Sequence, residues 1–408
     1  MNVVLISDYS VVRGGQDQAA IAGAISCRQR GHRVLFASGT GRNPIPDLAL
    51  AGVETISANY QDLISGSKSI KGIISGLWLS DSQRFIENLL RWFKPQDTVV
   101  HVHSWTKAFT ASIFPSIKKH GFRPAITLND YFLVCPNGAF FDFKAGQVCE
   151  RKPLSVSCVC TQCDRRGLHH KAWRVIRHGL QRFAGGLPQN LDHAIFVSNY
   201  SKQILEPYLS AGCKRYLVRN PVSVEHRQRV KAEVNQMFDF VGRLTKEKGC
   251  TDFASAASIA NVHARFLGDG YLRKEVHKLL PSAEITGWMS VGDVDRHLDK
   301  SRVLVFPSIW HEASPLSVAE ALAKGIPVLA SDACAAAEMI EPGVSGLLYR
   351  GGDVKSLAAA LRRLCDDELV RRLSESAYNM FWSNPPTLAR HAEDLTNVYK
   401  AVLASQSN

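Results

Sequence analysis

The first half of the chain alternates short apolar runs, rich in β-branched residues, with segments of helical periodicity. Strands are predicted at 2–7, 33–38, 97–104 and 124–130, and a helix is predicted over 16–30, ending before Gly31. Strands that alternate with helices are typical of parallel sheets, because a parallel pair needs a crossover connection. This half therefore predicts an α/β domain with a doubly wound sheet.

The second half repeats the same alternation. Apolar runs at 238–244, 263–270, 283–288, 302–308, 325–331 and 345–349 predict strands with helices between them. Two similar α/β units in tandem, joined near 216–224, are therefore expected. A last helix is predicted from about Pro386 to Ala404, after the break WSNPP, and its periodicity does not say which unit it packs on.

Length and composition agree with two soluble domains. The chain has 408 residues, 45% of them apolar, and no apolar run long enough to span a bilayer. The N-terminus has no basic segment or cleavage pattern of a signal peptide, so we expect a cytoplasmic protein. The net charge of +12 favours anionic partners. Ten cysteines in that compartment indicate reduced thiols or metal ligands.

The stretch SIWHEASPLSVAEALAKG carries two carboxylates, Glu312 and Glu320, in a Glu-x7-Glu spacing. Ser314 before a proline predicts a helix start, with serine as the cap. The amides of Leu316 and Ser317 would then form an anion site at the positive end of the helix. The preceding strand places this site at the carboxyl edge of a parallel sheet, where α/β folds bind ligands.

These features together fit a nucleoside diphosphate sugar, which has a phosphate group between two sugars. Glu312, in the loop, can bind one set of hydroxyls, and Glu320, in the second helical turn, can bind another. The segment FVGRLTKEKGC adds Arg243 and Lys248 after another strand, where they can clamp a diphosphate and stabilise it as a leaving group. In the alternative interpretation, Glu320 is a solvated acid on a helix surface and the Ser-Pro pair only caps the helix. Arg243 and Lys248 are then ordinary surface charges.

The ordered set of Arg243, Lys248, the Glu-x7-Glu spacing, FLGDG and AEITGWMS resembles the large family of retaining glycosyltransferases with the GT-B fold. The resemblance covers nearly the whole chain and is densest over 241–349. It implies two Rossmann-like domains that face a cleft, and a last helix that crosses back to the first domain. The implied N-terminal domain is 1–218 with about 384–408, and the donor domain is 219–383.

The resemblance also implies roles for single residues. Arg243 and Lys248 would hold the donor diphosphate, Glu320 the ribose, Trp288 the base, and Glu312 the transferred sugar. It implies a reaction that retains the anomeric configuration and needs no metal, because the two basic residues replace a cation. The acceptor is implied to be deprotonated with help from the leaving phosphate.

The first domain contributes fewer signals. Gly14 and Gly15 fall in the first β–α turn, where a missing side chain lets the backbone approach phosphate or sugar. His101 and His103 end a strand, and a structural histidine is the commoner role; the resemblance favours His103 as the residue that contacts donor sugar or acceptor. The segment TLNDYF has Asn129 where the family usually has histidine, which makes an acid–base role at this position unexpected.

Half of the cysteines fall within 135–163, an insertion that is short and polar. A C-x2-C spacing in CERKPLSVSCVCTQC chelates zinc readily, so a structural zinc and a set of small buried thiols are both open interpretations. Which four of five cysteines would bind the metal is also open. The five are Cys135, Cys149, Cys158, Cys160 and Cys163.

A strongly amphipathic helix is predicted after this insertion. One face carries Leu168, Ala172, Val175, Ile176, Leu180 and Phe183, and the other carries Lys171, Arg174, Arg177, His178 and Arg182. Such a helix can lie on an anionic membrane surface, or it can pack on the core through its apolar stripe. The segment Ile73 to Leu79 is a second candidate for membrane contact.

The sequence thus predicts a hexosyltransferase that uses a UDP or GDP sugar and a lipid-linked glycan acceptor, in O-antigen, capsule or exopolysaccharide assembly. It would be cytoplasmic and peripheral on the inner face of the plasma membrane. An epimerase or phosphorylase on the same scaffold is the alternative. A nicotinamide dehydrogenase is excluded by the missing G-x-G-x-x-G motif, and no nucleic-acid-binding signature accompanies the basic charge.

Overall fold

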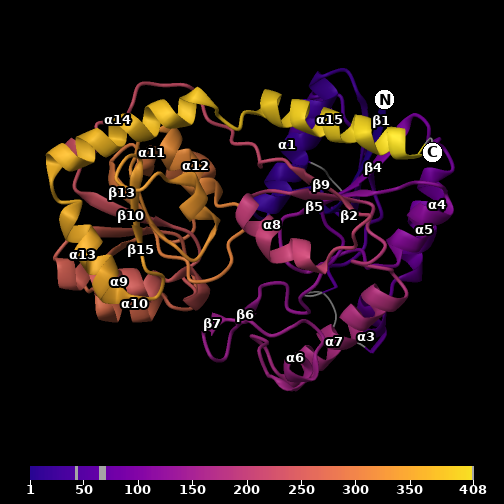
Figure 1. Ribbon diagram of the computed structural model, residues 1–408, viewed down its shortest axis with the longest axis horizontal. Coiled ribbons are helices and arrows are strands. Elements are labelled where there is room, and N and C mark those ends of the chain that lie inside the picture. The colour runs from indigo at the N-terminus through magenta and orange to yellow at the C-terminus, as the bar shows by residue number, and fades with distance from the viewer. Residues whose placement is uncertain (42–44, 64–69, 407–408) are drawn as a thin grey trace. The chain divides into compact units, whose positions relative to one another are not determined.

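The computed structural model describes residues 1–41, 45–63 and 70–406. The chain divides into two compact units, each built around one parallel sheet (Figure 1). Unit 1 comprises Met1–Phe140, Glu150–Pro221 and Pro386–Asn408. Unit 2 comprises Phe141–Cys149 and Val222–Pro385. In the described ranges, no helix combines the length and low polarity that crossing a membrane requires.

Unit 1 has a seven-stranded sheet in the order β3-β2-β1-β4-β5-β8-β9, with every neighbouring pair parallel. Its strands are β1 (Asn2–Tyr9), β2 (Arg33–Thr40), β3 (Glu54–Ser57), β4 (Thr98–Val102), β5 (Ala125–Leu128), β8 (His193–Phe196) and β9 (Lys214–Leu217). Its helices are α1 (Gly15–Gln29), α2 (Pro46–Leu50), α3 (Ile70–Leu77), α4 (Ser80–Leu90), α5 (Ile113–Lys119), α6 (Val156–Cys160), α7 (Leu168–Phe183), α8 (Asn199–Leu205), η1 (Glu206–Tyr208) and α15 (Leu388–Gln406).

The last helix of the chain, α15, completes the core of unit 1. It lies alongside α1 (Figure 1), and Leu395, Val398 and Tyr399 are buried in one cluster with apolar residues of α1 and the sheet. The hydroxyl of Tyr399 also forms a hydrogen bond of 2.7 Å with Nδ1 of His101. A helix that ends the sequence is therefore part of the domain that begins it.

Unit 2 has a six-stranded parallel sheet in the order β12-β11-β10-β13-β14-β15. Its strands are β10 (Met237–Val241), β11 (Ala264–Leu267), β12 (Glu284–Ile285), β13 (Ser301–Phe306), β14 (Val328–Ser331) and β15 (Gly346–Tyr349), with a separate antiparallel pair of β6 (Phe141–Asp142) and β7 (Gln147–Val148). Its helices are η2 (Ala232–Val234), η3 (Lys246–Lys248), α9 (Cys250–Ala260), α10 (Arg273–Leu279), α11 (Val291–Leu298), α12 (Leu316–Ala323), η4 (Ala335–Met339), α13 (Val354–Arg363) and α14 (Asp367–Ser383).

The predicted fold class, α/β with two doubly wound parallel sheets, is confirmed. Every apolar run that predicted a strand contains one. Three strands of unit 1, β3, β8 and β9, were not predicted. β9 is an edge strand of sequence KRYL with no buried residue, so its apolar pattern is too weak to indicate a strand.

Helix α7 forms as predicted, but it buries its polar face, whereas one of the two interpretations expected it to bury its apolar face. The interpretation that it packs through its apolar stripe is wrong: Leu168, Ile176 and Phe183 are exposed, whereas Lys171 and His178 are buried. The helical period sets which residues share a face, but what surrounds the helix decides which face is covered.

A buried ion pair holds the centre of the sheet in unit 2. Asp239 of β10 and Arg265 of β11 lie opposite each other in the ladder, and two hydrogen bonds of 2.8 Å join carboxylate and guanidinium. Ser301 of β13 donates its hydroxyl to the same carboxylate, and Arg265 also donates to the carbonyl of His297 at 2.9 Å. These contacts tie three neighbouring strands together, beside the point where the register between β10 and β13 shifts.

Removing one partner of this pair should destabilise unit 2 strongly. We expect Asp239→Ala to lower the free energy of unfolding by about 3–5 kcal/mol, because Arg265 keeps a buried and unpaired charge. The double variant Asp239→Leu with Arg265→Met should be less destabilised than Asp239→Ala, since no charge stays buried. Urea denaturation checks both, and a double variant less stable than the single one would contradict the assignment.

Candidate active site

The site in unit 2 lies where the sheet changes direction. β10 is the first strand of this sheet, with β11 on one side and β13 on the other, so the connections diverge between β10 and β13. Ligands of open α/β sheets bind at such a point, outside the carboxyl ends of the strands. The segments that leave these two strands are 242–249 and 307–315, and they contain Arg243, Lys248, Glu312 and Ser314 of the predicted donor site.

A glycine brings the two segments into contact. Gly249 has a φ of +67°, and a Cβ at this position would lie 1.9 Å from the carbonyl oxygen of Pro307. Only glycine permits both the left-handed backbone and this approach. The amide of Ile309 completes the contact by donating to the carbonyl of Glu247 at 3.0 Å. The loop after β10 and the loop after β13 are therefore held together by backbone contacts.

Lys248 and Glu312 form an ion pair across these two loops. The indole N–H of Trp310 donates to the same carboxylate oxygen of Glu312 at 2.8 Å, and the Lys248 ammonium lies 5.4 Å from the centre of the indole ring. Both charged side chains are about 16–17% exposed. Trp310 was not predicted; its place two residues before Glu312 in the loop is the only signal in the sequence.

Arg243 stands apart from this pair, although it leaves the same strand. Its side chain is 54% exposed, and it forms an ion pair of 4.0 Å with the buried Glu247. An exposed guanidinium with one long contact can turn toward an incoming anion at little cost. The structure thus gives one basic side chain already paired at close range and one that projects into solvent.

Helix α12 begins one residue later than the sequence predicted. Its N-cap residue is Pro315, so the expectation that Ser314 caps the helix and proline occupies the first turn is wrong by one position. Leu316 and Ser317 are the first two helical residues, and amides in the first turn have no partner within the helix. The predicted positive helix end therefore lies directly after the loop that carries Glu312.

Glu320 is placed in the second turn of α12, as expected, and is largely shielded from water. Burial raises the pKa of its carboxyl, and the nearby Asp295 adds to this rise, while Lys324 opposes it. Lys324 is itself paired with Asp295 at 2.9 Å. Trp288 follows β12 at the edge of the same sheet, and its side chain is 76% exposed.

The first β–α turn of unit 1 is open at the predicted glycines. Gly14 is the N-cap residue of α1, has an extended backbone, and has no atom within 4 Å of the place where a Cβ would stand. Gly15 is the first residue of the helix. The next residue, Gln16, donates its side-chain amide to the carbonyl of His103 at 2.8 Å. The turn after β1 is thereby tied to the end of β4.

The two histidines that end β4 differ in their surroundings. Both ring nitrogens of His101 have partners at 2.7 Å, the hydroxyls of Tyr399 and Thr127. His103 is 1% exposed, and neither of its ring nitrogens has a hydrogen-bond partner among the described residues. Burial lowers the pKa of both rings, so His103 is neutral and can accept or donate one hydrogen bond.

A small cavity beside His103 contains a carboxyl that the sequence did not single out. Gln16, His103, Thr127 and Asp130 line this cavity together with neighbouring residues. Burial raises the pKa of Asp130 to about 6, and the hydrogen bond from the amide of Phe132, 3.0 Å long, opposes this rise only in part. Asp130 is missed by sequence reasoning because its unusual property comes from its surroundings and not from its spacing.

Asn129 has a structural partner. Its side-chain oxygen accepts a hydrogen bond of 3.0 Å from the side chain of Asn220, near the end of the segment Glu150–Pro221 of unit 1. The predicted absence of an acid–base role at 129 stays a prediction.

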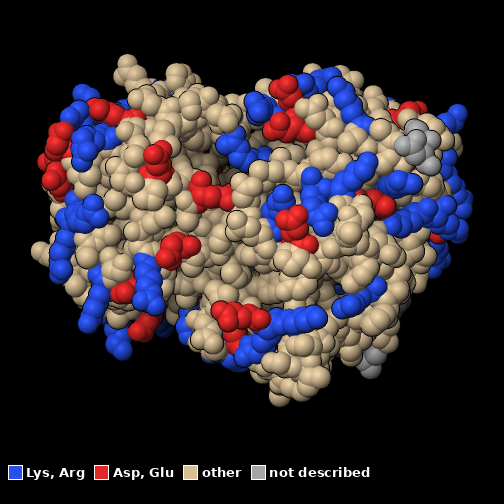
Figure 2. Space-filling model, in the orientation of Figure 1, with Lys and Arg blue, Asp and Glu red and all other residues tan. Residues whose placement is uncertain are grey.

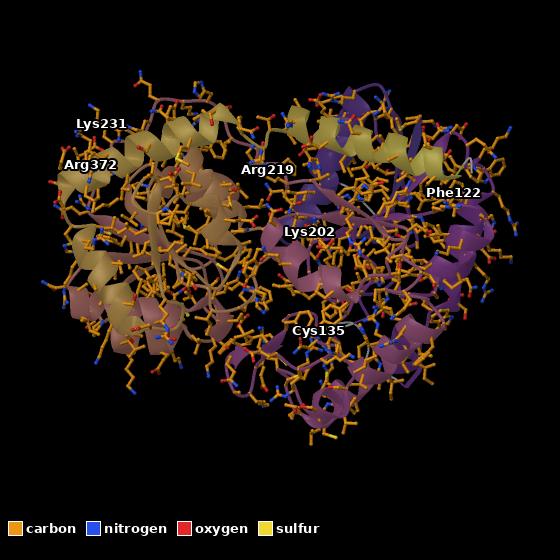
Figure 3. The ribbon with its side chains drawn as sticks, in the orientation of Figure 1. Phe122, Cys135, Lys202, Arg219, Lys231 and Arg372 are labelled. Carbon is orange, nitrogen blue, oxygen red and sulfur yellow. The ribbon has the colours of Figure 1, made fainter. Side chains whose placement is uncertain are left out.

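Two of the clustered cysteines contact one buried lysine. Lys171 donates to the sulfur of Cys163 at 3.2 Å and lies 3.8 Å from that of Cys158; Cys135, labelled in Figure 3, bonds Asn137 at 3.1 Å. Cys160 is exposed, and Cys149 belongs to unit 2. In the ranges the structure describes, no three His, Cys, Asp or Glu side chains are close enough to hold a metal. The structural zinc stays a prediction.

The comparison with known families identifies the class of domain that unit 2 forms. Residues 223–380, nearly all of unit 2, match the model of the family described as Glycosyl transferases group 1. The chain therefore contains a glycosyltransferase group 1 domain, as the resemblance predicted, and the predicted retention of configuration stays a prediction.

Several known proteins are similar to this chain. An uncharacterized 42.6 kDa protein in the cps region of Klebsiella pneumoniae is 26% identical over 348 residues, which cover 81% of this chain and 84% of that protein. The Escherichia coli UDP-Gal:alpha-D-GlcNAc-diphosphoundecaprenol alpha-1,3-galactosyltransferase is 29% identical over 157 residues, 35% of this chain and 40% of the enzyme.

Solved structures confirm the GT-B fold. A glycosyltransferase from Rickettsia africae has a TM-score of 0.68 at 17% identity and covers 98% of both chains. Anabaena HepE, in complex with UDP, has a TM-score of 0.67 at 14% identity and covers 98% of this chain and all of its own. At such identities the likeness establishes the fold alone.

Replacing the buried carboxyl in unit 1 should stabilise the fold in a pH-dependent way. A pKa raised from 3.8 to about 6 means that Asp130 destabilises the fold once it is ionised, so stability is lost as the pH rises through about 6. We expect Asp130→Asn to be more stable than the parent by up to about 3 kcal/mol at pH 8 and nearly equal at pH 4.

Urea unfolding at the two pH values measures this difference. The amide introduced by Asp130→Asn would keep an oxygen acceptor for the backbone N–H of Phe132, so the variant tests the charge and not the hydrogen bond. The exposed Asp47→Asn in the same unit is the control for removing a surface charge. An equal effect of Asp130→Asn at both pH values would contradict the raised pKa.

Proposed function

We propose that this protein transfers a hexose from a nucleoside diphosphate sugar to a hydroxyl of a lipid-linked glycan, with retention of the anomeric configuration. The observation that carries the proposal is the group formed by Lys248, Glu312 and Trp310 beside the start of α12, at the switch point of the unit 2 sheet. It combines a cation and a helix end, suited to phosphate, with a carboxylate and an indole N–H, suited to sugar hydroxyls.

Each end of the donor then has a partner of matching chemistry. The diphosphate lies between Lys248, Arg243 and the amides of Leu316 and Ser317, which stabilise it as it leaves. Glu320 binds the ribose hydroxyls; a carboxylate largely removed from water has acceptor capacity that a pair of hydroxyls can satisfy. The exposed ring of Trp288 is suited to stacking on the base.

The ion pair of Lys248 with Glu312 must rearrange when the donor binds. A diphosphate attracts Lys248 more strongly than one carboxylate does, since it carries more charge. Glu312 is then released to accept hydrogen bonds from the transferred sugar while Trp310 keeps it oriented. With two basic side chains and a helix end on the leaving group, no metal is required in this proposal.

On the acceptor side, His103 and Asp130 supply the groups that bind a hydroxyl. A neutral imidazole that lacks a hydrogen-bond partner among the described residues shares one cavity in unit 1 with a carboxyl of raised pKa. A hydroxyl placed there can donate to one group and accept from the other. The leaving phosphate, as the resemblance implies, takes the proton that the hydroxyl loses on transfer.

Relatives support the lipid-linked acceptor and the pathway. The E. coli enzyme adds galactose to a diphosphoundecaprenol-linked sugar, the Klebsiella protein lies in a cps region, and the Erwinia amylovora relative is an amylovoran biosynthesis glycosyltransferase. The similar proteins include users of uridine and of guanosine nucleotides: HepE is in complex with UDP, and a Mycolicibacterium smegmatis relative depends on GDP-mannose. We propose cell-surface polysaccharide assembly at the inner face of the plasma membrane.

A nucleotide panel tests the donor site directly. Thermal shift with UDP, GDP, ADP and CMP, alone and as sugar nucleotides, should show stabilisation by one diphosphate, about 2.7 kcal/mol at 100 times its dissociation constant. Lys248→Ala and Glu320→Ala should abolish most of the shift, and the exposed Lys274→Ala should retain it. The proposed donor site would be refuted if no nucleotide in the panel raised the melting temperature, or if both site variants kept the thermal shift.

Neutralising Glu312 should separate binding from transfer. In Glu312→Gln the amide can still accept from Trp310, but Lys248 loses its competing anion, so the matching nucleoside diphosphate should bind roughly 3–10-fold more tightly. Sugar transfer should fall by about 100-fold or more, because the sugar loses a charged acceptor. Calorimetry and a product assay measure the two effects, with the exposed Glu341→Gln as control. Weaker nucleotide binding would argue against the rearrangement.

A further inference from the structure

Helix α7 turns its polar side inward because a loop without regular structure lies beneath it. The segment that follows β5 leaves backbone carbonyls that need donors. Gln181 donates to the carbonyls of Phe132 and Leu133 at 3.1 and 3.0 Å, and Arg174 donates to that of Asn137 at 2.9 Å. An apolar face could not satisfy these buried acceptors. The polar contacts therefore fix the rotation of the helix about its axis.

The consequence is an apolar stripe that faces away from unit 1. Leu168, Ala172, Ile176 and Phe183 share the outward face, and the three large side chains are 69%, 54% and 85% exposed. An amphipathic helix on a soluble protein normally buries this face. Here the buried face is already committed to the loop, so the stripe has no partner within the described part of unit 1.

Two neighbouring helices extend the stripe into a patch. α6 adds Val156 and Val159, 80% and 44% exposed, and α3 adds Ile73 and Ile74, 47% and 61% exposed. Seven of the eighteen exposed large apolar residues in the described ranges thus come from α3, α6 and α7. We call these seven residues the apolar patch.

The three helices are joined by direct contacts. The indole N–H of Trp173 in α7 donates to the carbonyl of Ile73 in α3 at 3.0 Å, and Lys171 in α7 reaches Cys158 in α6. Figure 1 shows the three helices following one another along the lower edge of unit 1, and in Figure 2 the surface over α6 is uncharged. The seven residues of the apolar patch therefore come from three neighbouring helices.

The exposed charges of residues 151–191, which contain α6 and α7, have one sign. Between Arg151 and Leu191 the chain has a single acidic residue, Asp164, which is buried and paired with Arg174 at 3.0 Å. Exposed cations lie before, between and after the apolar residues of α6 and α7: Lys152, Arg165, Arg166 and Arg182. Apolar residues among cations match a bilayer that contains anionic lipids. Two copies of this surface would repel each other.

We propose that the apolar patch of α3, α6 and α7 inserts into the headgroup region of an anionic membrane, with α7 lying in the plane of the bilayer. The cations beside the patch then meet lipid phosphates, and Phe183, Ile176 and Leu168 enter the acyl boundary. This rests on the proposed function only in that a lipid-linked acceptor explains why the enzyme needs the membrane. The inserting face is the apolar one, which differs from adsorption through the basic face.

Vesicle flotation of the full chain tests the proposal. The protein should float with phosphatidylcholine vesicles that contain phosphatidylglycerol and should bind pure phosphatidylcholine at least about tenfold more weakly. Phe183→Asp with Ile176→Asp should weaken binding by about tenfold or more, since two large apolar contacts are lost. Arg182→Glu should weaken it and lower its sensitivity to salt, because fewer attractive charge contacts remain for salt to screen.

A matched control separates the apolar patch from apolar exposure in general. Leu50 in α2 is as exposed as Phe183, 85%, and Leu50→Asp should leave flotation unchanged. All substituted side chains are exposed, so the melting temperatures should agree within a few degrees, and circular dichroism checks that each variant folds. The nucleotide-induced thermal shift should be the same in every variant, because it reports on unit 2.

Three kinds of result would overturn the proposal. Wild-type protein that stays in the lower fraction, or patch variants that float like wild type, would exclude insertion through this patch. Equal binding to neutral vesicles would exclude the charge match. A dimer in light scattering that Phe183→Asp dissociates would assign the patch to a second copy instead. Flotation without any nucleotide shift would refute the proposed donor site while leaving the membrane surface intact, so the two failures are distinguishable.

Discussion

The carboxylate–guanidinium pair of Asp239 and Arg265 is the constraint on which the site in unit 2 depends. It joins β10 to β11, and the same carboxylate binds Ser301 of β13, so one carboxylate links three neighbouring strands of the sheet. The loops that follow β10 and β13 carry Lys248 and Glu312, more than sixty residues apart in sequence. A slip of one residue in a strand would turn its side chains to the other face and separate the two charges. A buried pair is a costly way to gain stability but an effective way to fix a single register.

Much of this arrangement is readable from the sequence, and the reason is local. Each strand of unit 2 is a short apolar run, and parallel strands place their following loops on one edge, so Arg243, Lys248, Glu312 and α12 could be expected there. The cap of α12 was misplaced by one residue because serine and proline are both acceptable at a helix start. Trp310 was missed because an aromatic residue in a loop has no signature before its partner is known.

The features that could not be predicted from the sequence depend on contacts between segments that are distant in the chain. The periodicity of α7 defines two faces, but only the carbonyls of the loop beneath it show that the polar face is buried. The unusual carboxyl of Asp130 likewise follows from the surroundings that shield it from water. The edge strand β9 has too little apolar character to be recognised, and it forms because β8 offers it a ladder.

The two units differ in whether their functional side chains have hydrogen-bond or ion-pair partners when no ligand is bound. In unit 2, Lys248, Glu312 and Trp310 satisfy one another, so a donor must exchange one set of contacts for another and gains only the difference. In unit 1, His103 has no hydrogen-bond partner among the described residues, Asp130 carries a desolvation penalty, and the outward face of α7 exposes apolar surface to water. Each of these lowers stability, and sequences depart from stable packing where activity requires it. In the functions proposed above, a hydroxyl would supply the hydrogen bonds that His103 and Asp130 lack, and a bilayer would cover the apolar face of α7. A lipid-linked acceptor would therefore complete unit 1, whereas the groups of unit 2 satisfy one another without a ligand.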